Sequence, residues 1–328
     1  MRIKLDMSDK YNKKIFVLSG VVVILALFYA GTLYFDPARV SIRNASFVWL
    51  ERRAADRADR IEISGTNGET TLVRNNDVWS VLRDGIEYPS RRFRIDDILD
   101  ILSTRGQFQI RGSTAASHER LGLTEEAANS ITVRAGTSTL LDLLLGDADA
   151  SGREINMRRR GSDEVRSGVD RLSVYVNSHV TAWFDLSLFP DLDMTSADLV
   201  QSLVIYPLHA HSEDEDENEH EAPVALMRSG SGWIISGVEN PDVSRADFYI
   251  RSVLDSTGID FRYGESFIAE GGVVMELGDG RRVTLTVGPF AEGTNHRIAE
   301  LEGYPFQFLL SDAVIARIFR PASFFERQ

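Results

Sequence analysis

Residues 202–208 read SLVIYPL, and the pattern that they open also occurs earlier in the chain, where it starts at RIEIS (60–64). RIEIS alternates polar and apolar residues, which is typical of a half-buried strand, and SLVIYPL begins the second copy at the matching place. A second strand and a tryptophan follow in each copy, as TTLVRNNDVWSVL (70–82) and as PVALMRSGSGWIIS (223–236). This order predicts an internal repeat in which Trp79 matches Trp233.

A helix and a run of strands continue each copy. FRIDDILDILSTRG and SRADFYIRSVLDSTG have apolar residues at helical spacing, and the predicted core faces are Ile95, Ile98, Leu99 and Leu102 in the first and Ala246, Ile250, Val253 and Leu254 in the second. LLDLLLGD (140–147) then matches RRVTLTVGP (281–289) as a strand. We expect each copy to end with a strand and a short helix, in 173–189 and in 306–325. The alternative is two unrelated α+β domains that share turn residues.

The segment HAHSEDEDENEHEA (209–222) lies where the first copy has only GTNGE, between the first two strands. We interpret it as an expanded hairpin loop, since a run of like charges repels itself and stays solvated. His209, His211 and His220 are weak candidates for capturing a divalent ion together with the seven carboxylates of 213–221. A specific metal site would need ligands held by a scaffold, which such a loop does not provide.

Composition excludes several classes of function. The net charge of the 328 residues is −13, which argues against a nucleic-acid-binding protein, since binding to phosphates needs a basic face. The absence of cysteine excludes disulfides, thiolate metal sites and cysteine nucleophiles. No lysine follows Lys14, so no downstream lysine can bind a nucleotide phosphate or form a Schiff base.

The stretch Ile15–Phe35 has no charged residue and is about as long as a bilayer-spanning helix. Basic residues precede it, and this bias predicts an N-terminus in the cytoplasm and an extracytoplasmic remainder. A cleaved signal peptide is the alternative, but its apolar core would be shorter, and Phe28 stands near Ala30 where a small residue would be needed. We therefore predict a single-pass anchor in the bacterial inner membrane.

Familiar catalytic motifs are absent from the sequence: it has no nucleophile elbow, Walker loop, dinucleotide fingerprint or zincin motif. His118 could be a general base, but we interpret it as part of an exposed helical turn. His179 is expected to cap or pack a helix, and His296 has no second histidine at ligand spacing. Carboxylates at 96–97 and 125–126 are explained by helix starts, where they favour the macrodipole.

Trp79 and Trp233 could stack on carbohydrate, but their equivalent places among apolar strand residues indicate core positions. The arginine runs at 91–92 and 158–160 could meet anionic lipid or cell-wall polymer. They could equally be exposed faces of strands and helices.

The motifs as a set resemble the bacterial domain of unknown function family 4340. The resemblance rests on RIEIS, TTLVRNNDVWSVL, RIDDILDIL, an L-G-L turn at 121–123, a strand ending L-L-G at 144–146 and a V-Y-x-V strand at 174–176. It covers most of 60–191 and, more weakly, the second copy, which lacks the L-G-L turn. Members of this family look like membrane-anchored, extracytoplasmic partners of ABC transporter systems of the gliding-motility type. The resemblance implies association with proteins and supplies no catalytic residue.

The sequence thus predicts an α+β protein with an N-terminal transmembrane helix followed by two tandem, strand-rich repeats. The expected parts are a cytoplasmic N-terminus (1–14), the transmembrane helix (15–35), a linker (36–58), the first repeat (59–192) and the second repeat (193–328), which includes the acidic loop. We expect no enzyme and no cofactor, but an accessory or scaffold protein of an ABC-type export or motility complex. A binding module for envelope glycan or polymer, and a hydrolase with an unrecognised site, are the alternatives.

Overall fold

The computed structural model describes residues 19–27, 29, 46–209, 222–230, 232–264 and 266–327. Its fold is mostly β-sheet, with 40% strand and 25% helix in three sheets over this described part. The predicted class, a transmembrane helix followed by α+β units, is therefore wrong. The periodic segments do form helices, but the two longest of those with defined bounds have 12 residues each, so the many short strands dominate.

The predicted transmembrane helix at 15–35 is a second correction. Most of this stretch lies outside the described residues, and residues 19–27 and 29 of it are helical. Among the residues that the structure describes, no helix is both long enough and apolar enough to cross a membrane. The location that was inferred from this stretch stays a prediction.

Two compact units make up the chain. The first contains residues 1–78 and 93–178, and the second contains residues 79–92 and 179–328. The expected repeats were divided instead at residue 192, so the observed second unit also includes a hairpin, 79–92, that comes from the middle of the first repeat.

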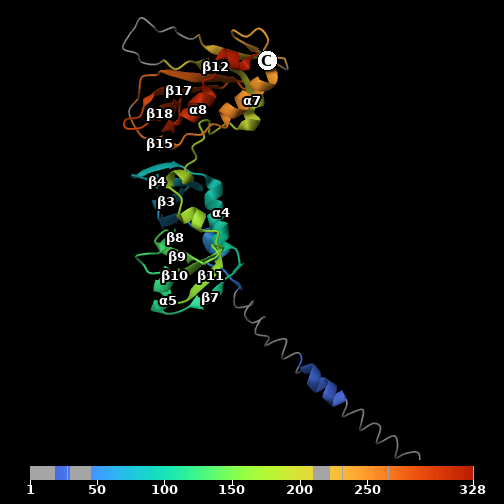
Figure 1. Ribbon diagram of the computed structural model, residues 1–328, viewed down its shortest axis with the longest axis vertical. Helices are drawn as coiled ribbons and strands as arrows, with labels where there is room; N and C mark the ends of the chain where they lie inside the picture. Colours follow the sequence, from blue (N-terminus) through green and yellow to red (C-terminus); the bar gives the residue numbers. More distant parts are fainter. Residues whose placement is uncertain are drawn as a thin grey trace, which may run out of the picture. The chain divides into compact units, whose positions relative to one another are not determined.

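The first unit is built around one large antiparallel sheet, with the strand order β3-β2-β8-β9-β10-β11-β7 inside the unit (Figure 1). A separate pair, β1 with β6, forms a small sheet of its own. The elements are β1 (Ser46–Phe47), α3 (Arg52–Ala55), β2 (Arg60–Gly65), β3 (Gly68–Asn75), α4 (Arg92–Ser103), β6 (Gly106–Gln107), β7 (Gln109–Gly112), α5 (Ala115–Arg120), β8 (Asn129–Ala135), β9 (Ser138–Ala148), β10 (Glu154–Arg159), β11 (Val165–Val169) and α6 (Ser173–Val176).

The core of this unit follows the predicted periodicities. Alternate residues of β9 are buried, as are their cross-strand partners Ile131 and Val133 in β8. On α4 the buried residues are Ile95, Ile98 and Leu102, three of the four that were predicted, whereas Leu99 is half-buried. Each such buried side chain contributes about 1.5–3 kcal/mol to folding.

The second unit has the strand order β14-β13-β12-β16-β17-β18-β19-β15 in its sheet. Its elements are β4 (Val78–Arg83), β5 (Ile86–Pro89), η1 (Val180–Trp183), η2 (Met194–Leu199), β12 (Val200–Tyr206), β13 (Val224–Ser229), β14 (Gly232–Ile235), α7 (Val243–Leu254), β15 (Asp260–Arg262), β16 (Gly271–Leu277), β17 (Arg282–Phe290), β18 (Arg297–Leu301), β19 (Gln307–Leu310), α8 (Asp312–Ile318) and η3 (Ala322–Phe325). The first residue of β4, Val78, belongs to the first unit.

The two sheets have the same strand order. Seven consecutive strands correspond in each sheet: the order β3-β2-β8-β9-β10-β11-β7 of the first matches β13-β12-β16-β17-β18-β19-β15 of the second. Helix α4 follows the fourth strand of the first copy, β5, and α7 follows the third strand of the second copy, β14, whereas α6 and α8 follow the last strand of each sheet in the chain. The V-Y-x-V segment at 174–176, which was predicted as a strand, lies in helix α6, because the preceding residues of β11 already supply the last strand.

A glycine at matching positions of β9 and β17 is closely approached by another segment of the chain. A Cβ on Gly146 would lie 2.1 Å from the carbonyl oxygen of Leu121, and one on Gly288 would lie 2.1 Å from the ring of Phe267. Because the neighbour of Gly146 is backbone, a side chain does not fit there, whereas at Gly288 the ring of Phe267 would have to move. The matching glycines of the repeat thus mark a close approach in both copies, to backbone in the first and to a side chain in the second.

The hairpin 79–92 is joined to the second unit by an aromatic and polar cluster. Ser90 forms a bridge with Phe184, and Tyr88 stacks on Phe261 with ring centroids 5.4 Å apart. Arg83 donates hydrogen bonds to Asp260 and to the carbonyl oxygen of Phe261, both at 2.7 Å. Burial lowers the pKa of Arg83, but its hydrogen bond and charge interaction with Asp260 outweigh burial and raise the pKa overall.

Candidate functional site: the open face of the second sheet

Each sheet has a core face and an outer face, and strand pairing shows which positions in the two sheets are equivalent. In the second unit Trp233 donates a hydrogen bond from Nε1 to Asp247 of α7 at 2.8 Å, so it points toward the helix. Ile234, the next residue of β14, points away from the helix because successive strand residues face opposite sides. Met227 is paired with Ile234 and with Ser202, so it shares this outer face.

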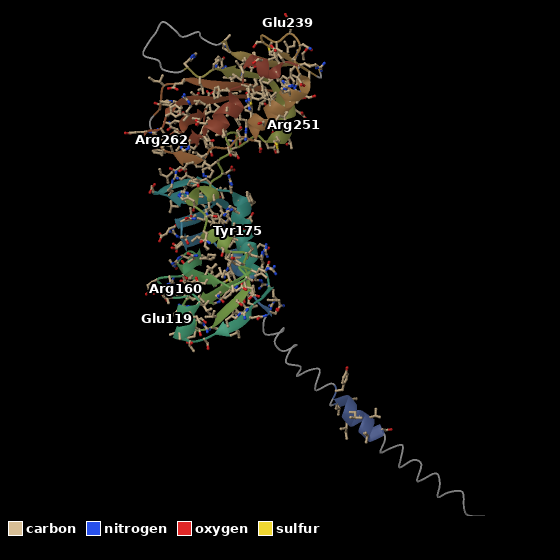
Figure 2. All side chains as sticks on the ribbon, viewed as in Figure 1. Glu119, Arg160, Tyr175, Glu239, Arg251 and Arg262 are labelled. Atoms are coloured by element: carbon tan, nitrogen blue, oxygen red, sulfur yellow. The ribbon has the colours of Figure 1, made fainter. Side chains whose placement is uncertain are left out.

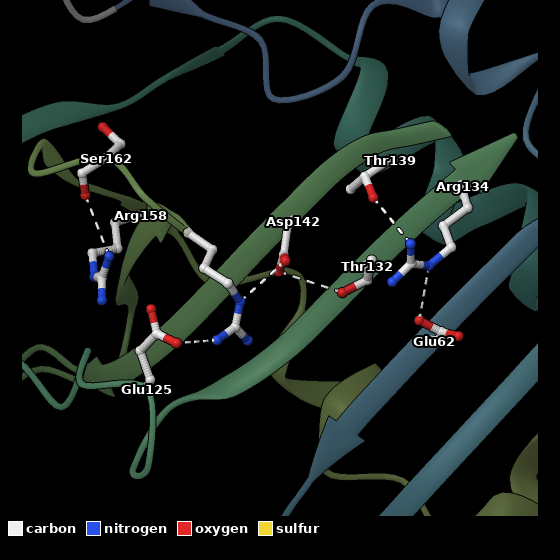
Figure 3. A network of polar contacts seen from close by, with 9 residues as sticks. Glu62, Glu125, Thr132, Arg134, Thr139, Asp142, Arg158 and Ser162 are labelled. Atoms are coloured by element: carbon white, nitrogen blue, oxygen red, sulfur yellow. Dashed lines mark hydrogen bonds and ion pairs between the residues drawn. The ribbon is translucent and has the colours of Figure 1, made fainter. Parts of the chain in front are cut away.

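The outer face of the first sheet is polar, and charged side chains on it form ion pairs with one another (Figure 3). Glu62 binds Arg60 and Arg134, at 2.7 and 3.1 Å. Burial raises the pKa of Glu62, but these two arginines outweigh it and lower the pKa below its ordinary value. Arg160 similarly binds Asp142 and Glu125, at 3.0 and 2.6 Å.

The equivalent row of the second sheet is mostly apolar, although the same face also carries Ser202 and Glu276, which are hydrogen-bonded to each other. In the first sheet, Thr71, Glu62, Thr132 and Asp142 stand opposite one another on adjacent strands. In the second sheet the same row reads Ala225, Val204, Val274 and Thr284. One row of polar side chains has thus become a row of small and apolar ones in the second copy.

Large apolar side chains on this second face are exposed to solvent. The exposed fraction is 44% for Tyr206, 50% for Met227 and 55% for Ile234. A contiguous exposed apolar surface with polar residues around it is typical of an interaction site. We call the outer positions Tyr206, Met227 and Ile234 together with Ala225, Val204 and Val274 the open face.

One hollow borders the open face through Tyr206 and Val274, and two further hollows continue from it through shared lining residues toward β17 and β18. The first, about 370 Å³, includes Tyr206, His209 and Thr284 in its lining. The second, about 660 Å³, shares Thr284 with the first and adds Glu300 and Glu302. The third, about 500 Å³, shares Glu300 and is lined further by the residues Arg262, Tyr263, Gly264, Ser266, Tyr304, Pro305, Phe306 and Gln307, of which Arg262 is labelled in Figure 2.

One wall of these hollows is held in place by an arginine. Arg297 of β18 forms an ion pair with Glu270, donates a hydrogen bond to the carbonyl oxygen of Gly288 at 2.9 Å, and lies over the ring of Phe290 at 4.4 Å. Glu270 precedes β16, so these contacts fix the start of that strand against β17 and β18. The first hollow, which Glu270 lines, therefore belongs to a fixed part of the sheet, and rigid elements position binding residues well.

The arrangement is suited to binding. An apolar centre with threonine hydroxyls, carboxylates and one arginine, Arg282, at its edge has the composition of a protein–protein interface, with an apolar core and a polar rim. The described residues contain no group of three or more histidine, cysteine, aspartate or glutamate side chains that could hold a metal ion.

The three weak metal candidates are placed as follows. His209 is exposed and lines the first hollow, whereas His211 and His220 lie outside the described residues, as does most of the acidic loop. Strands β12 and β13 pair as an antiparallel hairpin on either side of this segment, as expected for a hairpin loop.

The other histidines have structural roles. His118 is half-buried on α5, where Nε2 lies 2.9 Å from the carbonyl oxygen of Asp163. His179 caps η1 by accepting a hydrogen bond from the backbone N–H of Thr181, which confirms the expected capping role. His296 comes directly before β18 and its backbone carbonyl accepts from Ala291.

Trp79 and Trp233 are both buried, in agreement with their prediction as core residues. The arginine run at 158–160 is also structural. Arg158 is buried and donates to the carbonyl oxygen of Leu123 at 2.9 Å, Arg159 donates to the carbonyl oxygen of Trp49, and Arg160 belongs to the ion-pair network described above.

Sequence reasoning missed the open face. Val204 and Val274 lie between core residues of their strands and are themselves apolar. In the sequence both strands are therefore nearly continuous apolar runs, and the outer positions cannot be told from the core positions. A signal was nevertheless present: Glu62 and Thr132 in the first repeat correspond to two valines in the second, and the difference becomes visible once the repeats are aligned through their strand pairs.

Comparisons of this chain with protein-family models, with curated proteins and with solved structures give no match.

Proposed function

We propose that this protein is a non-catalytic accessory or scaffold protein that binds another protein through the open face of its second sheet. The observation that carries the proposal is the change of one cross-strand row from polar in the first unit to apolar in the second. Burying exposed apolar surface drives most protein association. Covering the apolar face of the second sheet with another protein would remove its apolar side chains from water and so stabilise the complex.

The size of the exposed side chains supports the same proposal. Tyr206 and Met227 are of the kinds that are enriched in interfaces, where large side chains fill pockets on the partner. They project from paired strands, which hold them in position before binding, and such pre-organisation reduces the entropy lost on association.

The class of partner follows from the resemblance to family 4340. That resemblance implies a subunit of an ABC-type transporter complex, and no catalytic residue. An apolar face with a polar rim fits a folded protein subunit better than it fits a soluble small molecule.

A module that binds envelope glycan is the second candidate. It gains support from Tyr263, which is 71% exposed and lines the third hollow together with Tyr304 and Glu300. Sugars pack on exposed aromatic rings. The buried Trp79 and Trp233 give no such surface.

Affinity capture with matched variants tests the proposal. The full chain carrying a tag is extracted in detergent, and co-purified proteins are compared between wild type, Met227→Arg with Ile234→Arg, and the control Phe248→Arg. Phe248 is exposed on helix α7 and is not part of the open face, so its replacement matches the change in charge at another apolar site.

We expect transporter subunits with the wild type and the control, and their loss with the open-face variant. The same subunits with all three proteins would contradict the open face as the binding surface. If envelope polysaccharide co-purifies with the wild type and does not co-purify with Tyr263→Ala, the result would favour the glycan-binding module instead.

A further inference from the structure

A separate cavity lies in the first unit, beside the small β1–β6 sheet. Its volume is about 270 Å³, and it lies among the end of α4, the segment 106–108, β10 and the end of β11. The lining residues are Trp49, Ile101, Thr104, Arg105, Gly106, Gln107, Phe108, Met157, Val169, Arg171 and Leu172. None of these belongs to the open face of the second sheet.

The inside of this cavity is apolar and its walls are fixed. Met157, Leu172 and Trp49 are buried. The rings of Trp49 and Phe108 meet edge to face with centroids 5.5 Å apart. Phe108 also fills the space in front of Gly168, where a Cβ would lie 2.4 Å from the ring, so the aromatic wall cannot shift toward β11.

One polar group in this apolar wall lacks a partner. Trp49 is 3% exposed, and its Nε1–H has no hydrogen-bond acceptor among the described residues. A buried donor left unsatisfied costs stability, and native proteins rarely retain one without a function. A ligand oxygen in the cavity would supply the missing acceptor.

Two cations stand at the mouth of the cavity. Arg105 and Arg171 line it and are exposed, and over the part of the chain that the structure describes neither side chain forms an ion pair or a hydrogen bond. By contrast, Arg134 and Arg160 on the outer face of the first sheet are each paired with carboxylates. A guanidinium binds carboxylate oxygens through two N–H groups.

We propose that this cavity binds a small apolar carboxylate. The apolar part of the ligand lies against Trp49, Phe108 and Met157, and its carboxylate lies between Arg105 and Arg171. The volume is sufficient, because a dry cavity of roughly 150 Å³ already binds benzene. Two sources present this chemistry: a free carboxylic acid, and the C-terminal residue of a peptide. The site is independent of the proposed function, since it uses the first unit.

Calorimetric titration of the full chain tests this inference. The probes are 4-phenylbutyrate and its neutral amide for the free acid, and Gly-Gly-Phe with a free or an amidated C-terminus for the peptide. We expect saturable binding of at least one of the two carboxylates and binding of the amides at least about tenfold weaker, as for the loss of one charge-assisted hydrogen bond. Whichever carboxylate binds more tightly identifies the source.

Variants show whether binding uses this cavity. Arg105→Gln and Arg171→Gln should each weaken binding by about tenfold, and Arg120→Gln, an exposed arginine on α5, should leave it within about twofold. Trp49→Phe should weaken binding and abolish the ligand-dependent change in tryptophan fluorescence. Absence of saturable binding by both carboxylates, or unchanged affinity in both Arg105→Gln and Arg171→Gln, would overturn the proposal. The arginine side chains are exposed, so these variants are expected to fold, and circular dichroism checks this.

Discussion

Replacing Arg83 by methionine should destabilise the second unit far more than replacing another arginine that forms an equally short ion pair. Methionine keeps most of the apolar volume of the side chain but removes the guanidinium. Arg83 donates to Asp260 and to the carbonyl oxygen of Phe261, and the guanidinium lies 4.8 Å from the ring centre of Tyr88 and 4.6 Å from that of Phe184.

The size of the effect follows from these contacts. The hydrogen bond to the charged Asp260, whose side chain is 29% exposed, contributes about 1.5–2 kcal/mol, at the lower end for a charged pair because water still reaches it. The bond to the Phe261 carbonyl adds about 1 kcal/mol and the two ring contacts about 0.5 kcal/mol each. Some of this is regained by the methionine, so we expect a loss of about 3 kcal/mol in the free energy of unfolding.

Arg281 is the matched control. It also forms an ion pair at 2.7 Å, with Asp279, but both side chains are close to half exposed. Arg281→Met should therefore change the free energy of unfolding by less than about 0.5 kcal/mol.

Urea unfolding followed by tryptophan fluorescence is a suitable assay. In a Trp49→Phe background the remaining tryptophans, Trp79, Trp183 and Trp233, all belong to the second unit, so the signal reports that unit. A double-mutant cycle with Asp260→Asn should give a coupling of about 1–2 kcal/mol between the two side chains. The reasoning is refuted if Arg83→Met and Arg281→Met shift the transition equally, or if the cycle shows no coupling.

Three other predictions concern the fold. Gly146→Ala places a Cβ against the carbonyl oxygen of Leu121 and should lower the free energy of unfolding by about 1–3 kcal/mol in chemical denaturation. Gly232→Ala should be nearly neutral, because its Cβ would make only ordinary van der Waals contact, 3.4 Å from Cγ2 of Val243. Tyr175→Phe removes the hydrogen bond to Asp97 and should cost about 1 kcal/mol. Burial and this bond raise the pKa of Tyr175 to about 12. The contribution of the hydrogen bond to the free energy of unfolding should therefore be complete below pH about 10 and disappear as the pH rises through about 12. An equal difference in stability between wild type and Tyr175→Phe at about pH 8 and at about pH 12 would contradict this. A fragment 193–328 omits residues 79–92 and 179–192 of the second unit, so it should bind a hydrophobic dye and unfold with low cooperativity. Cooperative unfolding like that of the full chain would show both omitted segments to be dispensable.

The outline of the repeat could be predicted because it depends on local patterns. Strand alternation around Leu143, the helical faces at Ile98 and Ile250, and the paired glycines are all visible along the chain. These patterns report which residues avoid water in a single element, and that is what periodicity records.

The predictions that failed depended on more than one element. The V-Y-x-V segment has the residue types of a strand, but the sheet already ends with β11, so the chain turns into helix α6 there. The apolar stretch at 15–35 has the composition of a membrane span, but the described chain has no helix that meets the length and hydropathy needed.

The candidate sites were beyond the reach of sequence patterns for a related reason. Val204 looks like a core residue, and only its pairing with Ala225 and Val274 places it on the outer face. Arg105 and Arg171 are far apart in the chain, and both line one cavity because α4 and β11 end beside it.

The sequence by itself determined the repeat, the core faces of the strands and helices, and the exclusion of cysteine and lysine chemistry, because each depends on residue type and local spacing. Only the tertiary structure decided which sheet face stays open, which arginines remain without a carboxylate, and that the hairpin 79–92 packs in the second unit. Those properties depend on contacts between residues that are distant in the chain, and local periodicity contains no information about them.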